Sequence, residues 1–180
     1  ALADDRIEGL PLNQRPAKIF IVDDSEQDLR VHAATLRAQG YEIVSARSGE
    51  EALLRVEAEV PDLFLIAASM AGMDGFTLCN HLKEDARLIN VPVIFVTASP
   101  THKEIDRGFA AGGVDYISKP CHLSEFLARV RTHIKQYHLL QEVARLEDIA
   151  IDANPLTHLP GNNTIQSTIQ DAIDGALEMT

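Results

Sequence analysis

The chain has 180 residues, of which 46% are hydrophobic and 24% charged, and 16 Lys and Arg against 27 Asp and Glu give a formal net charge of −11. This composition is typical of a soluble globular protein and excludes collagen, a disordered polar chain and a disulfide-stapled miniprotein. The negative charge disfavours binding to nucleic acid, whose phosphates it repels. No apolar run approaches the roughly 20 residues that span a bilayer. We therefore expect no nucleic acid or membrane partner. The two distant cysteines, Cys79 and Cys121, are typical of a cytoplasmic protein.

Short apolar runs alternate with amphipathic segments after a lead-in at residues 1–16, which we predict to be extended or disordered. Strands are predicted at Lys18–Val22, Glu42–Ala46, Leu63–Ala67, Val93–Thr97 and Val114–Ile117. Helical patterns separate these strands, and parallel neighbours need such crossover connections. The predicted fold is therefore α/β, a doubly wound five-stranded parallel sheet with helices on both faces.

A long amphipathic helix is predicted after Pro120. Its apolar residues recur every three or four positions from Leu123 to Ile149, which corresponds to roughly seven or eight turns. The first half can pack on the sheet, and the second half extends beyond it. Because Leu139, Val143, Leu146 and Ala150 keep a coiled-coil-like spacing, we predict that this second half dimerises. The alternative is a solvated linker helix.

Two adjacent carboxylates, Asp23 and Asp24, follow the first predicted strand. The carboxyl ends of strands in an open parallel sheet form the ligand crevice. Oxygen ligands suit Mg²⁺, so the pair indicates a magnesium site. The alternative is structural, since Asp24, Ser25 or both could cap the helix that begins near Glu26.

Further motifs follow at the ends of the later strands. They are Pro61-Asp62-Leu63-Phe64-Leu65-Ile66, Met70-Ala71-Gly72-Met73-Asp74-Gly75-Phe76, Val96-Thr97-Ala98 and Asp115-Tyr116-Ile117-Ser118-Lys119-Pro120. In this order, the series resembles the receiver domain of two-component response regulators, over about residues 18–137. The resemblance implies a sheet of order 2-1-3-4-5, the arrangement that receivers share with flavodoxin.

The resemblance also implies roles for individual residues. Asp23 and Asp24 match the Mg²⁺-binding acidic pair, and Thr97 matches the switch hydroxyl. Tyr116 matches the aromatic switch residue, and Lys119 matches the phosphate-pairing lysine, followed by a cis peptide bond to Pro120. The last three residues also have structural interpretations. Thr97 could be an ordinary strand-end residue, Tyr116 a core aromatic ring and Lys119 a solvated charge.

One position departs from the family. The phosphate acceptor is an aspartate at the end of the third strand, where this chain has Ala67. A methyl group cannot form an acyl phosphate, and the loss of one of three carboxylates weakens cation binding. Lys119 can instead pair with Asp23 or Asp24. We therefore expect no catalytic residue and only a weakened Mg²⁺ site.

The tail Asn154-Pro155-Leu156-Thr157-His158-Leu159-Pro160-Gly161-Asn162 resembles the opening of a GGDEF domain, the diguanylate cyclase family. The expected organisation is a receiver at 17–137, a linker helix at 138–153 and the start of a GGDEF-like domain at 154–180. The catalytic signature of that family lies further along, so we expect no enzymatic activity from this chain itself. The whole protein would be a candidate diguanylate cyclase.

The sequence thus predicts a signal-transduction module, a degenerate receiver that controls a GGDEF-type output through dimerisation or partner contact. A homodimer through the long helix and the receiver face is the expected assembly, with a histidine kinase or another signalling protein as a further partner. Three alternatives stay open: a phosphorylatable receiver with an engineered Ala67, a protein that makes or degrades cyclic di-GMP, and a sensor of small anions in the crevice.

Overall fold

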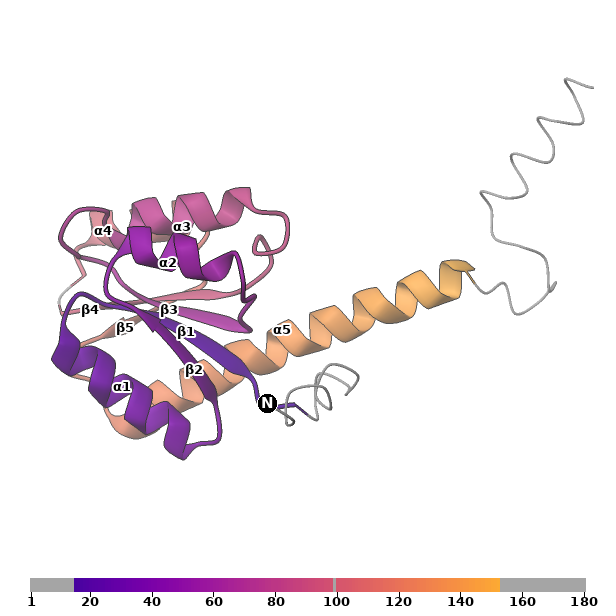
Figure 1. Cartoon of the computed structure of the whole chain (residues 1–180), viewed down its shortest axis with the longest axis horizontal. Helices are drawn as coiled ribbons and strands as arrows, with labels where there is room; N and C mark the ends of the chain where they lie inside the picture. Colours follow the sequence, from indigo (N-terminus) through magenta and orange to yellow (C-terminus); the bar gives the residue numbers. More distant parts are fainter. Residues whose placement is uncertain (1–14, 99, 153–180) are drawn as a thin grey trace, which may run out of the picture. The chain divides into compact units, whose positions relative to one another are not determined.

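A computed structural model of the chain describes residues 15–98 and 100–152 (Figure 1). In this part of the chain, strands and helices alternate without exception. The elements are β1 (Lys18–Val22), α1 (Glu26–Ala38), β2 (Glu42–Ala46), α2 (Gly49–Val56), β3 (Leu63–Ala67), α3 (Gly75–Glu84), β4 (Val93–Thr97), α4 (His102–Ala110), β5 (Asp115–Ser118) and α5 (Leu123–Asp152).

The five strands form one parallel sheet of order β2-β1-β3-β4-β5. This order and the bounds of the first four strands confirm the predictions. The fifth strand begins and ends one residue later than predicted, because its ladder with β4 starts at the pair Ile94 and Asp115. Val114 lies just before the ladder, where its N–H donates to the carbonyl of Val93 and its side chain remains exposed.

The sheet separates two layers of core. On one face, Ile19 and Ile21 of β1 belong to a cluster with α1 and the first part of α5. On the other face, Phe20 and Val22 belong to a cluster with α2 and α3. Figure 1 shows α1 below the sheet and α2 and α3 above it. Burial on both faces explains why the central strands are continuously apolar.

Side-chain caps fix where four helices begin. Ser25, Ser48, Asp74 and Thr101 each accept a hydrogen bond from a backbone N–H in the first turn of α1, α2, α3 and α4. Such a cap satisfies a donor that has no partner within the helix. Ser25, and not Asp24, therefore caps α1, and both aspartates after β1 remain available for other contacts.

The chain divides into two compact units, Ala1–His138 and Leu139–Thr180, and the division falls within α5. In the second unit, the described residues are the last fourteen of this helix, 139–152. Most of the predicted lead-in and all of the predicted GGDEF fragment lie outside the described residues. Within 15–152, apart from residue 99, no helix is long and apolar enough to cross a membrane.

Candidate functional site

A buried aspartate begins the site at the carboxyl end of the sheet. Asp23 directly follows β1, and its side chain is only 5% exposed. Its Oδ1 accepts a hydrogen bond of 2.9 Å from the N–H of Ser25, and its Oδ2 lies 3.4 Å from Nζ of Lys119. A buried carboxylate needs such donors to offset the loss of water. Asp23 is therefore held by the chain itself.

Lys119 follows β5 and joins two aspartates at this end of the sheet. Its Nζ lies 2.5 Å from Oδ2 of Asp28, a residue in the first turn of α1. Burial lowers the pKa of Lys119, but its contacts with Asp28 and Asp23 outweigh burial and leave the pKa raised. The hydrogen bond from Lys119 lowers the pKa of Asp28. The lysine and both acids thus form a charged cluster that is complete without a ligand.

The last residue of β3 offers no side-chain oxygen to this cluster. Ala67 is buried, 6% exposed, and lies opposite Val96 of β4 in the sheet register. Its carbonyl lies so close to Gly75 that a Cβ on that glycine would overlap the carbonyl oxygen. The chain therefore places a methyl group, within a tightly packed backbone, where the resemblance expects an acceptor carboxylate.

Asp24 lies apart from the charged cluster. Its side chain is exposed, and its Oδ2 accepts a hydrogen bond of 2.8 Å from the N–H of Ala71, in the loop between β3 and α3. Sequence analysis paired Lys119 with Asp23 or Asp24, whereas its partners in the structure are Asp23 and Asp28. Asp24 instead ties the loop after β3 to the end of β1.

These donors fit a magnesium ion poorly. Among the described residues, no group of three His, Cys, Asp or Glu side chains is placed to hold a metal ion. Mg²⁺ requires octahedral oxygen ligands, and here the Lys119 ammonium lies beside one of the two candidate carboxylates. A cation near Asp23 would have to displace that ammonium or bind beside it.

The two predicted switch residues lie on neighbouring strands. Thr97 ends β4, is half-buried, and its carbonyl accepts a hydrogen bond of 2.7 Å from the N–H of Lys119. Tyr116 in β5 donates its hydroxyl to the carbonyl of Glu104 at 2.6 Å. A side chain at Gly108 would overlap that hydroxyl, so this glycine allows Tyr116 to lie against α4. The Lys119-Pro120 bond is cis, as predicted.

Asp28 is the one member of the charged cluster that sequence analysis did not identify. It occupies the third position of α1, three residues after the cap at Ser25, and its N–H donates to that cap. Side chains of a helix lean toward its N-terminus, and the first turn of α1 lies at the carboxyl end of β1. An acidic residue at this position was therefore the available signal for a carboxylate near Lys119.

Comparisons with known proteins agree with this arrangement. Residues 19–131 match the family model of the response regulator receiver domain. The response regulator PleD of Caulobacter vibrioides is 34% identical over 131 residues, which are 73% of this chain and 29% of PleD. The heme response regulator HssR of Staphylococcus aureus is 35% identical over 67% of this chain and 52% of HssR. The chain thus spans about a third to a half of these relatives.

Solved structures are similar over the same part. The receiver domain of a signal transduction histidine kinase from Syntrophus aciditrophicus is 30% identical, with a TM-score of 0.62 over 67% of this chain and 91% of that one. The receiver domain of the histidine kinase PA1611 from Pseudomonas aeruginosa, 24% identical, has the same fold, with a TM-score of 0.63 over 67% of this chain and 99% of that one. The fold and the family match over residues 19–131 agree: this chain belongs to the response regulator receiver domain family.

Proposed function

We propose that this receiver controls an output domain by protein contact and does not accept a phosphoryl group on aspartate. One observation carries the proposal: β3 ends in Ala67, while Lys119 is paired with Asp28 and Asp23. An alanine cannot form an acyl phosphate. Internal acids already hold the lysine that would pair with a phosphoryl group.

Nearby side chains are poor substitutes for the missing acceptor. Ser69 is exposed in the loop after β3, but a phosphoserine is a stable ester and lacks the rapid reversal of an aspartyl phosphate. Asp62 precedes β3 and therefore lies at the opposite end of the sheet from Ala67. The chemistry supports a receiver that signals through its conformation or assembly.

Magnesium has at most a minor place in this proposal. The receiver domain of PA1611 is described with a magnesium ion coordinated in its active-site cleft. In this chain, Asp23 and Asp24 are the candidate ligands, and the ammonium of Lys119 competes with a cation at Asp23. We expect weak Mg²⁺ binding and no requirement for the ion.

The proposed output is a GGDEF-type domain, supported by the resemblance of residues 154–162 to the opening of that family. Diguanylate synthesis joins two nucleotides, so two cyclase domains must meet. The chain itself would be a non-enzymatic, cytoplasmic regulatory segment of a protein that uses cyclic di-GMP. A histidine kinase or another signalling protein would supply the input.

Restoring the carboxylate tests the absence of phosphorylation. The wild-type chain, Ala67→Asp and Ala67→Asn are incubated with acetyl phosphate and Mg²⁺, and intact mass is measured. We expect one phosphoryl group on Ala67→Asp only. A new carboxylate beside Asp23 adds a ligand for Mg²⁺ and a nucleophile, so Mg²⁺ affinity should rise about tenfold or more.

The asparagine variant is the matched control, because it has nearly the same shape as aspartate but cannot form an acyl phosphate. Phosphorylation of the wild-type chain would contradict the proposal. If Ala67→Asp folds, as measured by circular dichroism, yet remains unmodified, the assignment of position 67 as the degenerate acceptor is wrong.

A second proposal concerns assembly. In the part of α5 that belongs to the second unit, several large apolar side chains are at least 50% exposed, namely Leu139, Leu140, Val143, Leu146, Ile149 and Ile151. Burial of such a stripe contributes roughly 25 cal/mol for each Å² removed from water. A second copy of the same helix is the simplest partner, so we propose a homodimer through α5, extended by the receiver face.

Sedimentation equilibrium of the chain tests this assembly. Val143→Glu places a charge within the stripe, and Ala144→Glu places the same charge on the next residue, outside the predicted 139-143-146-150 spacing. We expect a dimer for the wild-type chain and for Ala144→Glu, and a monomer for Val143→Glu. A monomeric wild-type chain, or equal effects of both variants, would exclude the α5 dimer.

A further inference from the structure

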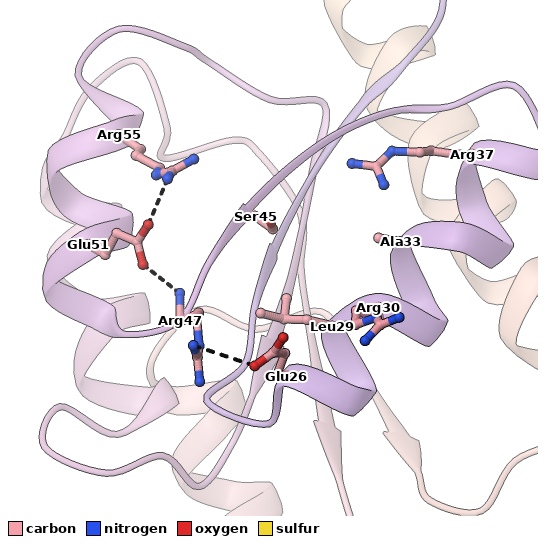
Figure 2. A pocket seen from close by; sticks show the side chains of 9 residues that line it. All are labelled: Glu26, Leu29, Arg30, Ala33, Arg37, Ser45, Arg47, Glu51 and Arg55. Atoms are coloured by element: carbon pink, nitrogen blue, oxygen red, sulfur yellow. Dashed lines mark hydrogen bonds and ion pairs between the residues drawn. The ribbon is translucent and has the colours of Figure 1, made fainter.

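A hollow of about 280 Å³ lies between α1, β2 and α2 in the first unit (Figure 2). It is separate from the charged cluster of Asp23, Asp28 and Lys119. Charged side chains line it together with small and apolar ones. The lining residues are Glu26, Leu29, Arg30, Ala33, Arg37, Ser45, Arg47, Glu51 and Arg55.

Helical spacing places charged side chains along both walls. On α1, Arg30 and Arg37 lie seven residues apart and therefore on the same side of the helix, with the small Ala33 between them. On α2, Arg55 follows Glu51 by one turn. Figure 2 shows Arg37 and Arg55 extending from opposite walls, with Ser45 of β2 between them.

The hollow is positively charged on a negatively charged chain. Four arginines and two glutamates line it, which gives a surplus of two positive charges, whereas the whole chain carries −11. Like charges gathered at one place repel each other, and a bound anion removes that repulsion. The local charge therefore favours an anionic ligand.

Two of the arginines have no partner among the described residues. Glu51 pairs with Arg55 at 2.8 Å, and Glu26 lies 3.7 Å from Arg47. The exposed side chains of Arg30 and Arg37 form no hydrogen bond or ion pair within the described part of the chain. Their guanidinium donors are therefore available to a ligand. Arg47 and Arg55 could each release a glutamate and bind the ligand in its place.

We propose that this hollow binds a small polyphosphate, either free or as the phosphate chain of a nucleotide. Guanidinium groups match phosphate oxygens in a bidentate geometry, and arginines from two walls suit an anion with several phosphoryl groups. The volume is close to the lower end of ordinary ligand pockets, which fits a small molecule better than a folded partner. The hydroxyl of Ser45 adds a donor between the walls. Binding at this hollow does not depend on whether residue 67 can accept a phosphoryl group.

Isothermal titration calorimetry of the chain with inorganic triphosphate and with ATP tests the proposal. Arg37→Gln removes one free guanidinium from the hollow. Arg131→Gln removes the same group from an exposed position on α5, where the structure records no ion pair for it. We expect affinity to fall about tenfold or more for Arg37→Gln, as expected for a lost charge-assisted hydrogen bond, and less than about twofold for Arg131→Gln.

The two probes distinguish the sources of the phosphate chain. Equal affinities would identify the phosphates as the whole recognised group, and tighter binding of ATP would add a contact with the nucleoside; both results support the site. No binding at millimolar concentration overturns the proposal. Equal losses for Arg37→Gln and Arg131→Gln also overturn it, since they would show a response to overall charge only. Arg30→Gln gives a second, independent measurement in the same hollow.

Discussion

The two ends of the sheet each contain a buried aspartate, but the two acids are held differently. Asp62 precedes β3 at the amino end and is 1% exposed, and Asp23 follows β1 at the carboxyl end and is 4% exposed. Asp62 is bound by groups from three segments of the chain. Asp23 accepts one backbone N–H and shares the ammonium of Lys119 with a second acid, Asp28.

At the amino end, every contact of Asp62 holds a part of the fold. Its Oδ1 lies 3.0 Å from Nη2 of Arg15 and 3.0 Å from Nε2 of His138, and its Oδ2 accepts a hydrogen bond of 2.7 Å from the N–H of Lys18. These groups belong to the segment before β1, to β1 itself and to α5. Asp62 therefore joins the sheet to the last residue of the first unit.

At the carboxyl end, one ammonium faces two carboxylates, and its contact with Asp28 is partly open to solvent. The Asp28 side chain is 37% exposed, so solvent screens its attraction to Lys119. The comparison shows that burial alone does not identify a functional acid. Asp62 has the surroundings of a structural carboxylate, whereas Asp23 lies beside Lys119 at the end of the sheet where the resemblance to receivers predicts a site.

The largest effect is expected from Asp62→Ala. The substitution leaves the N–H of Lys18 without its acceptor and removes the partner of Arg15 and His138. Loss of one partner of a buried charged pair costs about 3 kcal/mol of unfolding free energy. Urea unfolding at pH 7 measures this loss. A change below about 1 kcal/mol would show that the two ends of the sheet do not differ as argued.

The fold could be predicted closely because its signals are local. Ile19-Phe20-Ile21-Val22 and Val93-Ile94-Phe95-Val96 are continuously apolar, as strands buried on both faces must be. The predicted start of β5 was wrong by one residue, because Val114 is as apolar as a strand residue but lies outside the ladder. Only the pairing with β4 decides that boundary.

The site was less accessible to sequence analysis. The position of Ala67 at the end of β3 follows from the strand pattern, and the sequence alone shows that its side chain has no oxygen. Asp23 was one of the two predicted partners of Lys119, but the second partner in the structure, Asp28, does not follow from any motif. Helix geometry selects Asp28, because the cap at Ser25 fixes which side of the first turn faces the lysine.

The smallest effect is expected from Asp28→Asn, and its pH dependence is diagnostic. Lys119 lowers the pKa of Asp28 in the folded state, so the pair stabilises the fold above the unfolded pKa of about 3.9 and loses this contribution as the pH falls through the folded pKa. The pKa of Lys119 is raised, so its contribution persists below about pH 10.4 and is lost as the pH rises through its folded pKa.

Asp28→Asn should therefore reduce the unfolding free energy by less than about 1 kcal/mol between roughly pH 5 and 9, and this loss should disappear as the pH falls through the folded pKa of Asp28. Glu26→Gln is the matched control, since it removes an acid from the same first turn but does not contact Lys119. An equal pH profile for both variants would assign the effect to the helix N-terminus instead of the ion pair. A loss at pH 7 as large as that of Asp62→Ala would mean that Lys119 and Asp28 hold the carboxyl end as firmly as Asp62 holds the amino end.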